Sequence, residues 1–277
     1  MRINTNVSSL QAQRSLSEHS RQIESTSGKM SAGTRVRSAA DDAASLAIGL
    51  KQKSNIRSQY VAIRNANDAV SEFQVAEGSM SEVGNMLTRL RELSVQAATD
   101  TLQDEQRGML NAEYMSLRSE IERTLKTTKF NGNPLLQVKG NATRDFQIGT
   151  RGDDNSKLSI NQSDLNLSEF NLSIVDSSIP TKEEAQLNLG YIDKAIAKLS
   201  SNRALVGAFQ NRLTSTVNNL ETSRTNESSS FSQNMDTDYA HETSEHLRAK
   251  IKHDAATGVL AQANNFGSNA LKLLQDS

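Results

Sequence analysis

The sequence predicts an all-α fold with a small β element: a long antiparallel helical bundle with one or two β-hairpins, extended by terminal coiled-coil helices. Hydrophobic residues make up only 35% of the chain, aromatic residues 4%, and there is no Trp. Long stretches nevertheless keep the apolar spacing of helices, which is typical of narrow seams rather than a thick globular core. The two prolines, Pro134 and Pro180, separate these stretches from a middle with strand-like alternation.

Both ends of the chain carry weak helical stripes of apolar residues. The N-terminal stripe contains Ile3, Val7, Leu10, Leu16, Ile23 and Met30. The C-terminal stripe contains Leu247, Ile251, Leu260, Ala263 and Leu274. Chain termini are usually polar and frayed. We therefore expect the two ends to bury their stripes against each other or against further copies of the chain, and self-assembly is the first hypothesis.

Three long helices are predicted between the ends. From Ala69 to Leu90 apolar residues follow a heptad spacing. Asp100 and Thr101 suit a turn and an N-cap before a second helix, and Thr181 with Glu184 forms a capping box for a third. The expected seam of the bundle consists of Phe73, Met80, Val83, Leu87, Leu199, Val206 and Leu213.

The region 130–180 has a different pattern. Asn131-Gly132 and the segment from Gly149 to Asn155 have turn composition. Three short runs alternate with a period of two residues: Phe146-Gln147-Ile148, Leu158-Ser159-Ile160 and Leu172-Ser173-Ile174-Val175. This region is therefore predicted to form one or two short hairpins that join the second and third long helices.

Bulk composition excludes several classes of protein. The net charge of −1 and the absence of Lys/Arg runs argue against a nucleic-acid partner. The chain has no cysteine, which removes disulfides and thiolate chemistry. No stretch approaches the roughly 20 apolar residues of a membrane span. The first residues lack the apolar core of a cleaved secretion signal, so export would use another route.

Three motifs suggest chemistry but fit structural roles better. His241 and His246 are five residues apart on an expected helix, whereas a shared metal ion needs a spacing of four. Asp41-Asp42 has no neighbouring base and suits a helix start or a polar contact between subunits. The tripeptide at 151–153 (Arg-Gly-Asp) suits a hairpin turn better than adhesion. We therefore predict no enzyme activity, no metal and no cofactor.

Several blocks of the sequence resemble bacterial flagellin. In the N-terminal half they are Ser31-Ala32-Gly33-Thr34-Arg35-Val36-Arg37-Ser38-Ala39, Asp41-Asp42-Ala43-Ala44, Arg64-Asn65-Ala66-Asn67-Asp68, Arg91-Glu92-Leu93-Ser94-Val95-Gln96-Ala97 and Phe130-Asn131-Gly132. In the C-terminal half they are Asn202-Arg203-Ala204, Gly207-Ala208-Phe209-Gln210-Asn211-Arg212-Leu213, Val217-Asn218-Asn219-Leu220, Asp238-Tyr239-Ala240 and Val259-Leu260-Ala261-Gln262-Ala263-Asn264. The blocks occur in the family's order, and the resemblance is therefore far more specific than a single motif.

The resemblance implies a subunit that polymerises into the hollow helical filament of the bacterial flagellum for motility. Residues 1–33 with 236–277 would form the terminal-helix domain of the inner tube, and residues 34–235 the bundle domain of the outer tube. Large outer variable domains are expected to be missing, because the middle is short. The implied partners are further copies of the chain, hook-associated and capping proteins, an export chaperone, the flagellar type III export apparatus and a host innate immune receptor. The implied location is the secreted filament.

The resemblance also assigns roles to particular residues. The expected inner-tube contacts are Ile3, Val7, Leu10, Leu260, Leu271 and Leu274. The face that contacts the immune receptor in the family would include Arg89, Leu93 and Glu113. Arg89 and Leu93 are four residues apart on one helix, and we expect them to share an exposed stripe opposite the seam. The same face is an alternative candidate for packing between subunits.

Two other functions remain open at this point. A hook-filament junction protein shares the terminal blocks, but is expected to lack the dense matches at 91–97 and 202–213. A soluble helical binding or signalling module would be well folded at both ends as a monomer. Seeded polymerisation of the purified protein separates both alternatives from a filament subunit.

Overall fold

A computed structural model describes residues 5–137, 143–161, 166–167, 174 and 177–275, with side chains described as far as residue 265. The chain divides into two compact units: Met1–Ile56 with Thr225–Ser277, and Arg57–Arg224. Two long helices, α2 (Ala43–Ala97) and α6 (Lys182–Met235), contribute residues to both units. The fold is helical with two small antiparallel sheets, so the predicted fold class is confirmed.

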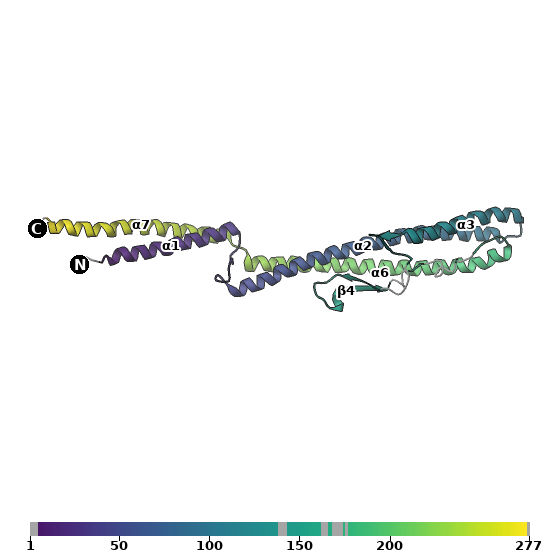
Figure 1. The fold of residues 1–277 in the computed structure, drawn as a ribbon, viewed down its shortest axis with the longest axis horizontal. Coiled ribbons are helices and arrows are strands. Elements are labelled where there is room, and N and C mark those ends of the chain that lie inside the picture. The colour runs from purple at the N-terminus through teal and green to yellow at the C-terminus, as the bar shows by residue number, and fades with distance from the viewer. Residues whose placement is uncertain (1–4, 138–142, 162–165, 168–173, 175–176, 276–277) are drawn as a thin grey trace. The chain divides into compact units, whose positions relative to one another are not determined.

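The first unit contains a pair of antiparallel helices, α1 (Val7–Ala32) and α7 (Tyr239–Gln275), drawn in purple and yellow in Figure 1. The Asn6 side chain caps α1 by accepting from the Ser9 amide. Gly33 ends the helix in the left-handed conformation, with φ of 68°. Just beyond it, the backbone of Thr34 pairs with that of Asp236, which ties the exit of α1 to the entry of α7.

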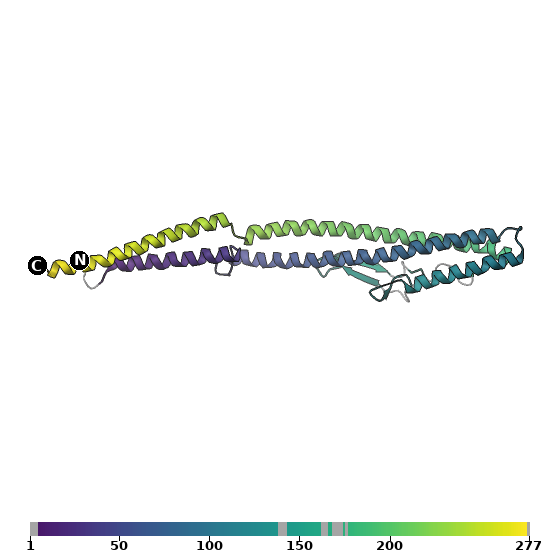
Figure 2. The same cartoon turned by 90° about the horizontal axis from the view of Figure 1, so that it is seen from above.

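The second unit is a bundle built from parts of α2 and α6 and from α3 (Asp104–Thr127). Two contacts show that α2 and α6 are antiparallel. Arg91 Nε lies 2.8 Å from Asp193 Oδ1, and Gln210 Nε2 donates a hydrogen bond to Glu77 Oε2 at 3.0 Å, so the later residue of α2 meets the earlier residue of α6. The helix α3 returns along α2 (Figure 2). One continuous apolar core fills the space between the elements of this unit.

The helix starts follow local capping chemistry, with one correction. The expected N-cap at Thr101 is wrong: α3 begins at Asp104, and the Gln103 amide donates to Gln106 Oε1 at 3.1 Å. At the start of α6 the Thr181 hydroxyl accepts from the Glu184 amide and donates to the Glu184 carboxylate. The second half of this capping box therefore closes on the hydroxyl instead of the Thr181 backbone.

The expected hairpins are present, and both belong to the second unit. Strands β1 (Lys129–Phe130) and β2 (Asn133–Pro134) flank a turn in which Asn131 and Gly132 have φ of 48° and 82°. Positive φ at both positions is typical of the tight hairpin turn expected for Asn-Gly. Strands β3 (Thr143–Gln147) and β4 (Lys157–Asn161) pair in antiparallel register, with a short 3-10 turn, η1 (Asp154–Ser156), before β4. Of the third alternating run only Ile174 is described; it is buried and outside any strand.

The two units differ in what they bury. All residues of the main apolar core lie between Ala66 and Leu213, within the second unit. Among the described residues of the first unit, the buried apolar side chains are Ala12, Val36, Met235, Ala249 and Ala263. The first unit therefore lacks a core of large side chains in its described part. Among all the residues that the structure describes, no helix has the length and apolarity that a membrane crossing requires.

Candidate assembly surface

The helices α1 and α7 meet along a seam with heptad spacing. The buried and half-buried positions of α1 include Ser9, Ala12, Leu16, His19, Ile23, Thr26 and Met30. In α7 they include Glu242, Ala249, Ala256 and Ala263, which are spaced seven residues apart. Spacings of three and four residues keep one face of each helix turned to its partner. Three of these four α7 positions are alanine, and this line of side chains offers little apolar area.

Polar contacts supplement this narrow seam. The Ser9 hydroxyl donates to Asn264 Oδ1 at 3.0 Å, and Lys29 Nζ lies 3.4 Å from Glu242 Oε1. Thr26 Oγ1 lies 3.1 Å from His246 Nδ1. Because the Thr26 hydroxyl donates to the carbonyl of Gln22, the imidazole is left as the donor in that contact. The seam thus specifies alignment through hydrogen bonds more than through apolar burial.

Large apolar side chains of the same two helices point to solvent. They are Val7, Leu10, Leu247, Ile251 and Val259, and each is more than half exposed. Leu247 and Ile251 are neighbours on one face of α7, and Ile251 is 68% exposed. Covering a side chain of this size stabilises a structure by about 1.5–3 kcal/mol. The pair of helices therefore presents apolar surface that a single copy of the chain leaves in water.

The residues expected to make inner-tube contacts occupy different environments. Val7 and Leu10 are exposed, and Leu260 is half-buried. Ile3 lies outside the described residues, and so do the side chains of Leu271 and Leu274. The sequence also left open that the apolar stripes of the two ends meet each other, and the structure shows this for part of them. Leu16, Ile23 and Met30 lie in the α1–α7 seam, whereas Leu247 and Ile251 face away from it.

The seven residues expected in the bundle seam all lie in the core of the second unit, each at most 3% exposed: Phe73, Met80, Val83, Leu87, Leu199, Val206 and Leu213. Their heptad spacing identifies this face because positions three and four residues apart lie on the same side of a helix.

The face that includes Arg89 requires a correction. Arg89 Nη2 lies 2.8 Å from Glu113 Oε1 on α3, and Arg89 Nη1 lies 3.1 Å from Glu92 Oε2. All three side chains are about half exposed, and the hydrogen bonds that Arg89 donates to Glu113 and Glu92 raise the pKa of Arg89. Leu93, however, is 0% exposed, so the expected exposed stripe with Arg89 is wrong. Both α3 and α6 pack on this part of α2, which widens its buried face.

The remaining motifs hold local structure. Asp42 Oδ1 accepts from the Ser45 amide at 3.0 Å and caps the start of α2, while Asp41 Oδ2 accepts from the amides of Arg37 and Ser38. Hydrogen bonds from the Ser45 side chain and amide lower the pKa of Asp42. In the β3–β4 connection, Asp153 accepts from the Ser156 hydroxyl. Within the described part of the chain, no cluster of three or more His, Cys, Asp or Glu residues has the arrangement of a metal site.

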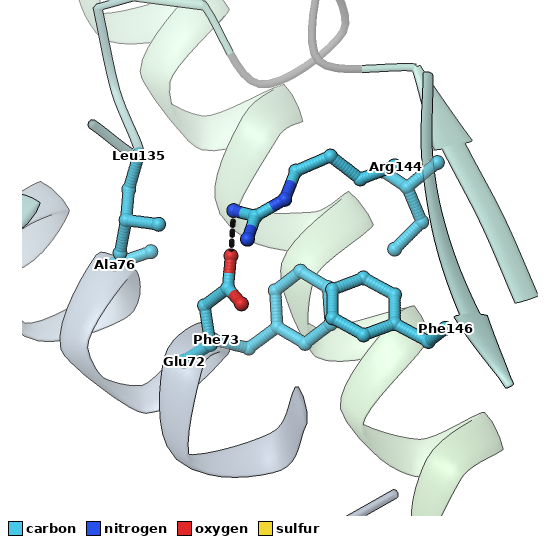
Figure 3. A pocket seen from close by; sticks show the side chains of 7 residues that line it. Glu72, Phe73, Ala76, Leu135, Arg144 and Phe146 are labelled. Atoms are coloured by element: carbon cyan, nitrogen blue, oxygen red, sulfur yellow. Dashed lines mark hydrogen bonds and ion pairs between the residues drawn. The ribbon is translucent and has the colours of Figure 1, made fainter. Parts of the chain in front are cut away.

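The sequence patterns did not predict one ion pair and the cavity that surrounds it. Glu72 on α2 forms an ion pair with Arg144 on β3, inside a small cavity lined by aromatic and aliphatic side chains (Figure 3). Neither residue belongs to a recognisable motif, and they are far apart in the sequence. The sequence signal was limited to a charged residue, Glu72, directly before Phe73 of the heptad.

Comparisons with known proteins agree with the architecture. The chain matches the family models of the bacterial flagellin N-terminal helical region over residues 3–141 and of the bacterial flagellin C-terminal helical region over residues 189–274. It is 35% identical over 275 residues to a flagellin of Halalkalibacterium halodurans, an alignment that covers 99% of this chain and 100% of the relative. It is 33% identical over 306 residues to a flagellin of Bacillus subtilis, with the same coverage. The crystal structure of Bacillus cereus flagellin matches with a TM-score of 0.51 and 25% identity, over 57% of this chain and 88% of that one.

Proposed function

The chain belongs to the bacterial flagellin family, and from that premise we infer that the exposed apolar face of α1 and α7 is its polymerisation surface. The protein is a structural subunit of the extracellular flagellar filament and serves motility; it is not an enzyme. The observation that carries the inference is the exposure of Val7, Leu10, Leu247, Ile251 and Val259 on a helix pair whose fully buried apolar side chains, among the described residues, are all alanine.

Assembly through this face follows from free-energy balance. Ordering a helix costs conformational entropy of about 1–2 kcal/mol per residue. The α1–α7 seam has few large buried side chains to offset that cost. A neighbouring copy supplies the missing burial, and assembly therefore completes the folding of the ends. The same reasoning supports inner-tube roles for Ile3, Val7, Leu10, Leu260, Leu271 and Leu274.

In this mechanism the terminal helices and the bundle form different layers of the filament. Residues 1–33 with 236–277 would line the inner tube, and residues 34–235 would form the outer tube. The boundary is supported by Gly33, which ends α1, and by the backbone bridge between Thr34 and Asp236 just before α7. The core within the bundle supports its ability to stay folded when the terminal helices are not engaged.

Ile251→Asp tests the polymerisation surface. The side chain is exposed in the single chain, so the substitution should leave the helical content and thermal midpoint of the monomer unchanged. In a filament, a charge without a partner would be buried, and we expect seeded polymerisation to stop. Circular dichroism reports the monomer, and electron microscopy with sedimentation reports polymer.

Ile251→Leu is the matched control, because it keeps an apolar side chain of the same volume. It should polymerise like the parent. Filaments of normal length and yield from the Ile251→Asp variant would remove this face from the assembly surface. Loss of polymer from both variants would mean that position 251 acts through the shape of α7 rather than through its burial.

The finer partners are part of the proposal. A subunit that acts outside the cell and whose ends stay unburied until assembly suits export in an unfolded state by the flagellar type III apparatus, with a chaperone covering the apolar face of α7. Hook-associated and capping proteins would meet the same terminal helices at the two ends of the filament. Pull-down of a chaperone by the Ile251→Leu protein but not by the Ile251→Asp protein would support the role of that face in export.

A host innate immune receptor remains a proposed partner of the charged face formed by Arg89, Glu92 and Glu113. An arginine that bridges two helices on an exposed surface suits an interface, since its guanidinium can donate hydrogen bonds to a partner while its methylene groups pack against apolar side chains. Arg89→Ala should reduce receptor activation by the soluble monomer without loss of the bundle. Leu93 is left unchanged in this test, because it belongs to the core.

A further inference from the structure

The cavity in Figure 3 joins the β3–β4 hairpin to α2 within the second unit. Glu72, Phe73 and Ala76 line it from the helix, Arg144 and Phe146 from β3, and Ile160 from β4. Its volume is about 20 Å³, room for about one water molecule. Except for the ion pair of Glu72 and Arg144, the described side chains that line it are apolar.

The two members of this ion pair differ in their access to water. The Glu72 side chain is 9% exposed, whereas the Arg144 side chain is 26% exposed. The guanidinium also lies 5.8 Å from the centre of the Phe146 ring, a cation–π contact on its own strand. Docking of the hairpin therefore strips water mainly from the carboxylate, while the cation keeps part of its hydration.

Removal of water from a carboxylate favours its protonated form. Burial raises the pKa of Glu72, and the charge of Arg144 opposes this effect without cancelling it. A group whose pKa is raised in the docked state stabilises that state below its ordinary pKa, and the contribution is lost as the pH rises through the raised value. The ionised carboxylate is thus the form that docks less well, even though it is the form that makes the ion pair.

Two further described contacts of the hairpin with α2 involve no titratable group. The rings of Phe73 and Phe146 lie 5.9 Å apart, and Phe73 stacks on Phe209 of α6 at the same distance. The Asn65 side chain donates to the carbonyl of Gln147 at 3.1 Å. The nearest other charges on α2 are Asp68, an exposed residue one turn before Glu72, and Glu77, which is bound by Gln210 of α6. Neither lines the cavity.

We propose that the β3–β4 hairpin is a proton-responsive flap, which takes up a proton at Glu72 as it docks on α2 and is therefore held more tightly when the pH falls. This regulation lies in the bundle and does not depend on polymerisation. The experiment uses the full-length monomer, so a negative result does not bear on the proposed assembly surface. A failure of the polymerisation test likewise does not bear on the flap.

Hydrogen–deuterium exchange of peptides from 143–161 tests the proposal. After correction for intrinsic exchange rates, protection in the parent protein should rise as the pH falls from about 7.5 to about 4.5, by on the order of tenfold for each unit by which docking raises the pKa. Glu72→Gln, which is neutral at every pH, should be flat across this range and at neutral pH should be more protected than the parent. Arg144→Gln removes the opposing charge and should make the response larger than in the parent.

Glu77→Gln is the matched control, since it exchanges a carboxylate for an amide on the same helix outside the cavity. It should keep the parent's response. Circular dichroism confirms for each variant that the helices are intact. A parent hairpin whose protection does not change with pH overturns the proposal. So does a Glu72→Gln hairpin that is less protected than the parent at neutral pH, because the ion pair would then be what holds it.

Discussion

Two buried polar side chains of the bundle, Arg107 and Asn202, differ in whether they have hydrogen-bond partners. Arg107 has three partners, since Nε donates to the carbonyl of Ala97 at 2.9 Å, Nη2 to the carbonyl of Thr99 at 2.8 Å and Nη1 to Asp104. It thereby satisfies one carbonyl at the last residue of α2 and one in the turn that follows the helix. Asn202 is 0% exposed, and neither its amide nitrogen nor its oxygen has a partner. Arg107 therefore stabilises the turn between α2 and α3, whereas Asn202 costs stability.

Arg107→Met should lower the stability of the monomer by about 2–3 kcal/mol, because two carbonyls lose a charged donor in a buried setting. Urea denaturation followed by circular dichroism measures the loss. Arg123→Met serves as the control, because the Arg123 side chain is exposed and pairs with Glu120 on its own helix. An unfolding midpoint for Arg107→Met equal to that of the control would contradict the capping role.

Asn202→Leu should raise the stability by about 1 kcal/mol, since an apolar group of similar size replaces two buried polar atoms without partners. Asn218→Leu on the exposed side of α6 provides the matched control and corrects for the higher helix propensity of leucine. Destabilisation by Asn202→Leu relative to this control would show that the Asn202 amide makes hydrogen bonds in solution.

At the scale of single elements, the helices are defined by their ends as much as by their stripes. Asn6 caps α1, Asp42 caps α2, Gln103 precedes α3 and Thr181 caps α6. The start of α2 follows directly on the segment in which Asp41 binds the amides of Arg37 and Ser38. Two ionised aspartates thus hold the segment that links α1 to α2.

The start of α2 should loosen in acid. Hydrogen bonds from Ser45 to Asp42, and from the amides of Arg37 and Ser38 to Asp41, lower the pKa of each carboxyl. Stability from a lowered pKa is present above the ordinary Asp value and is lost as the pH falls through the lowered value. After correction for intrinsic exchange rates, the protection of amides at residues 43–46 should therefore fall in that range. Asp42→Asn keeps an acceptor for the Ser45 amide and should reduce the response; an unchanged response would assign it to another group.

At the scale of the whole chain, apolar burial is unevenly divided. The second unit encloses its large side chains in one core. The described part of the first unit turns several of its largest side chains outward, and in the seam between α1 and α7 its larger apolar side chains are only half-buried. The bundle therefore buries its large side chains within one copy, whereas the described part of the terminal helices leaves several of its large side chains exposed.

Limited proteolysis of the monomer should remove the ends first. We expect cleavage within residues 1–32 and beyond about residue 234, and a resistant fragment that contains the bundle. The same sites should be protected after polymerisation, because neighbours then bury the helices. Mass spectrometry of the fragments identifies the boundaries. Ends that are as resistant in the monomer as in the filament would contradict assembly-dependent folding.

Much of this architecture follows from local sequence patterns. The heptad spacing from Ala69 to Leu90 identified the buried face of α2, and the Asn131-Gly132 turn and the alternating runs identified both described hairpins. Motifs along both halves of the chain identified the family. Such patterns are reliable here because helix periodicity, capping and turn conformation depend on residues only a few positions apart.

Other features depend on which elements meet. A stripe on an isolated helix shows that a face is apolar but does not show whether it meets its own chain or another copy, so the outward direction of Leu247 and Ile251 was not predictable. Leu93 is buried because two helices pack on α2 at that level, and a single heptad pattern describes only one of them. The meeting of Glu72 with Arg144 likewise depends on where the hairpin docks. Long-range packing sets these environments, and no local period of the sequence encodes them.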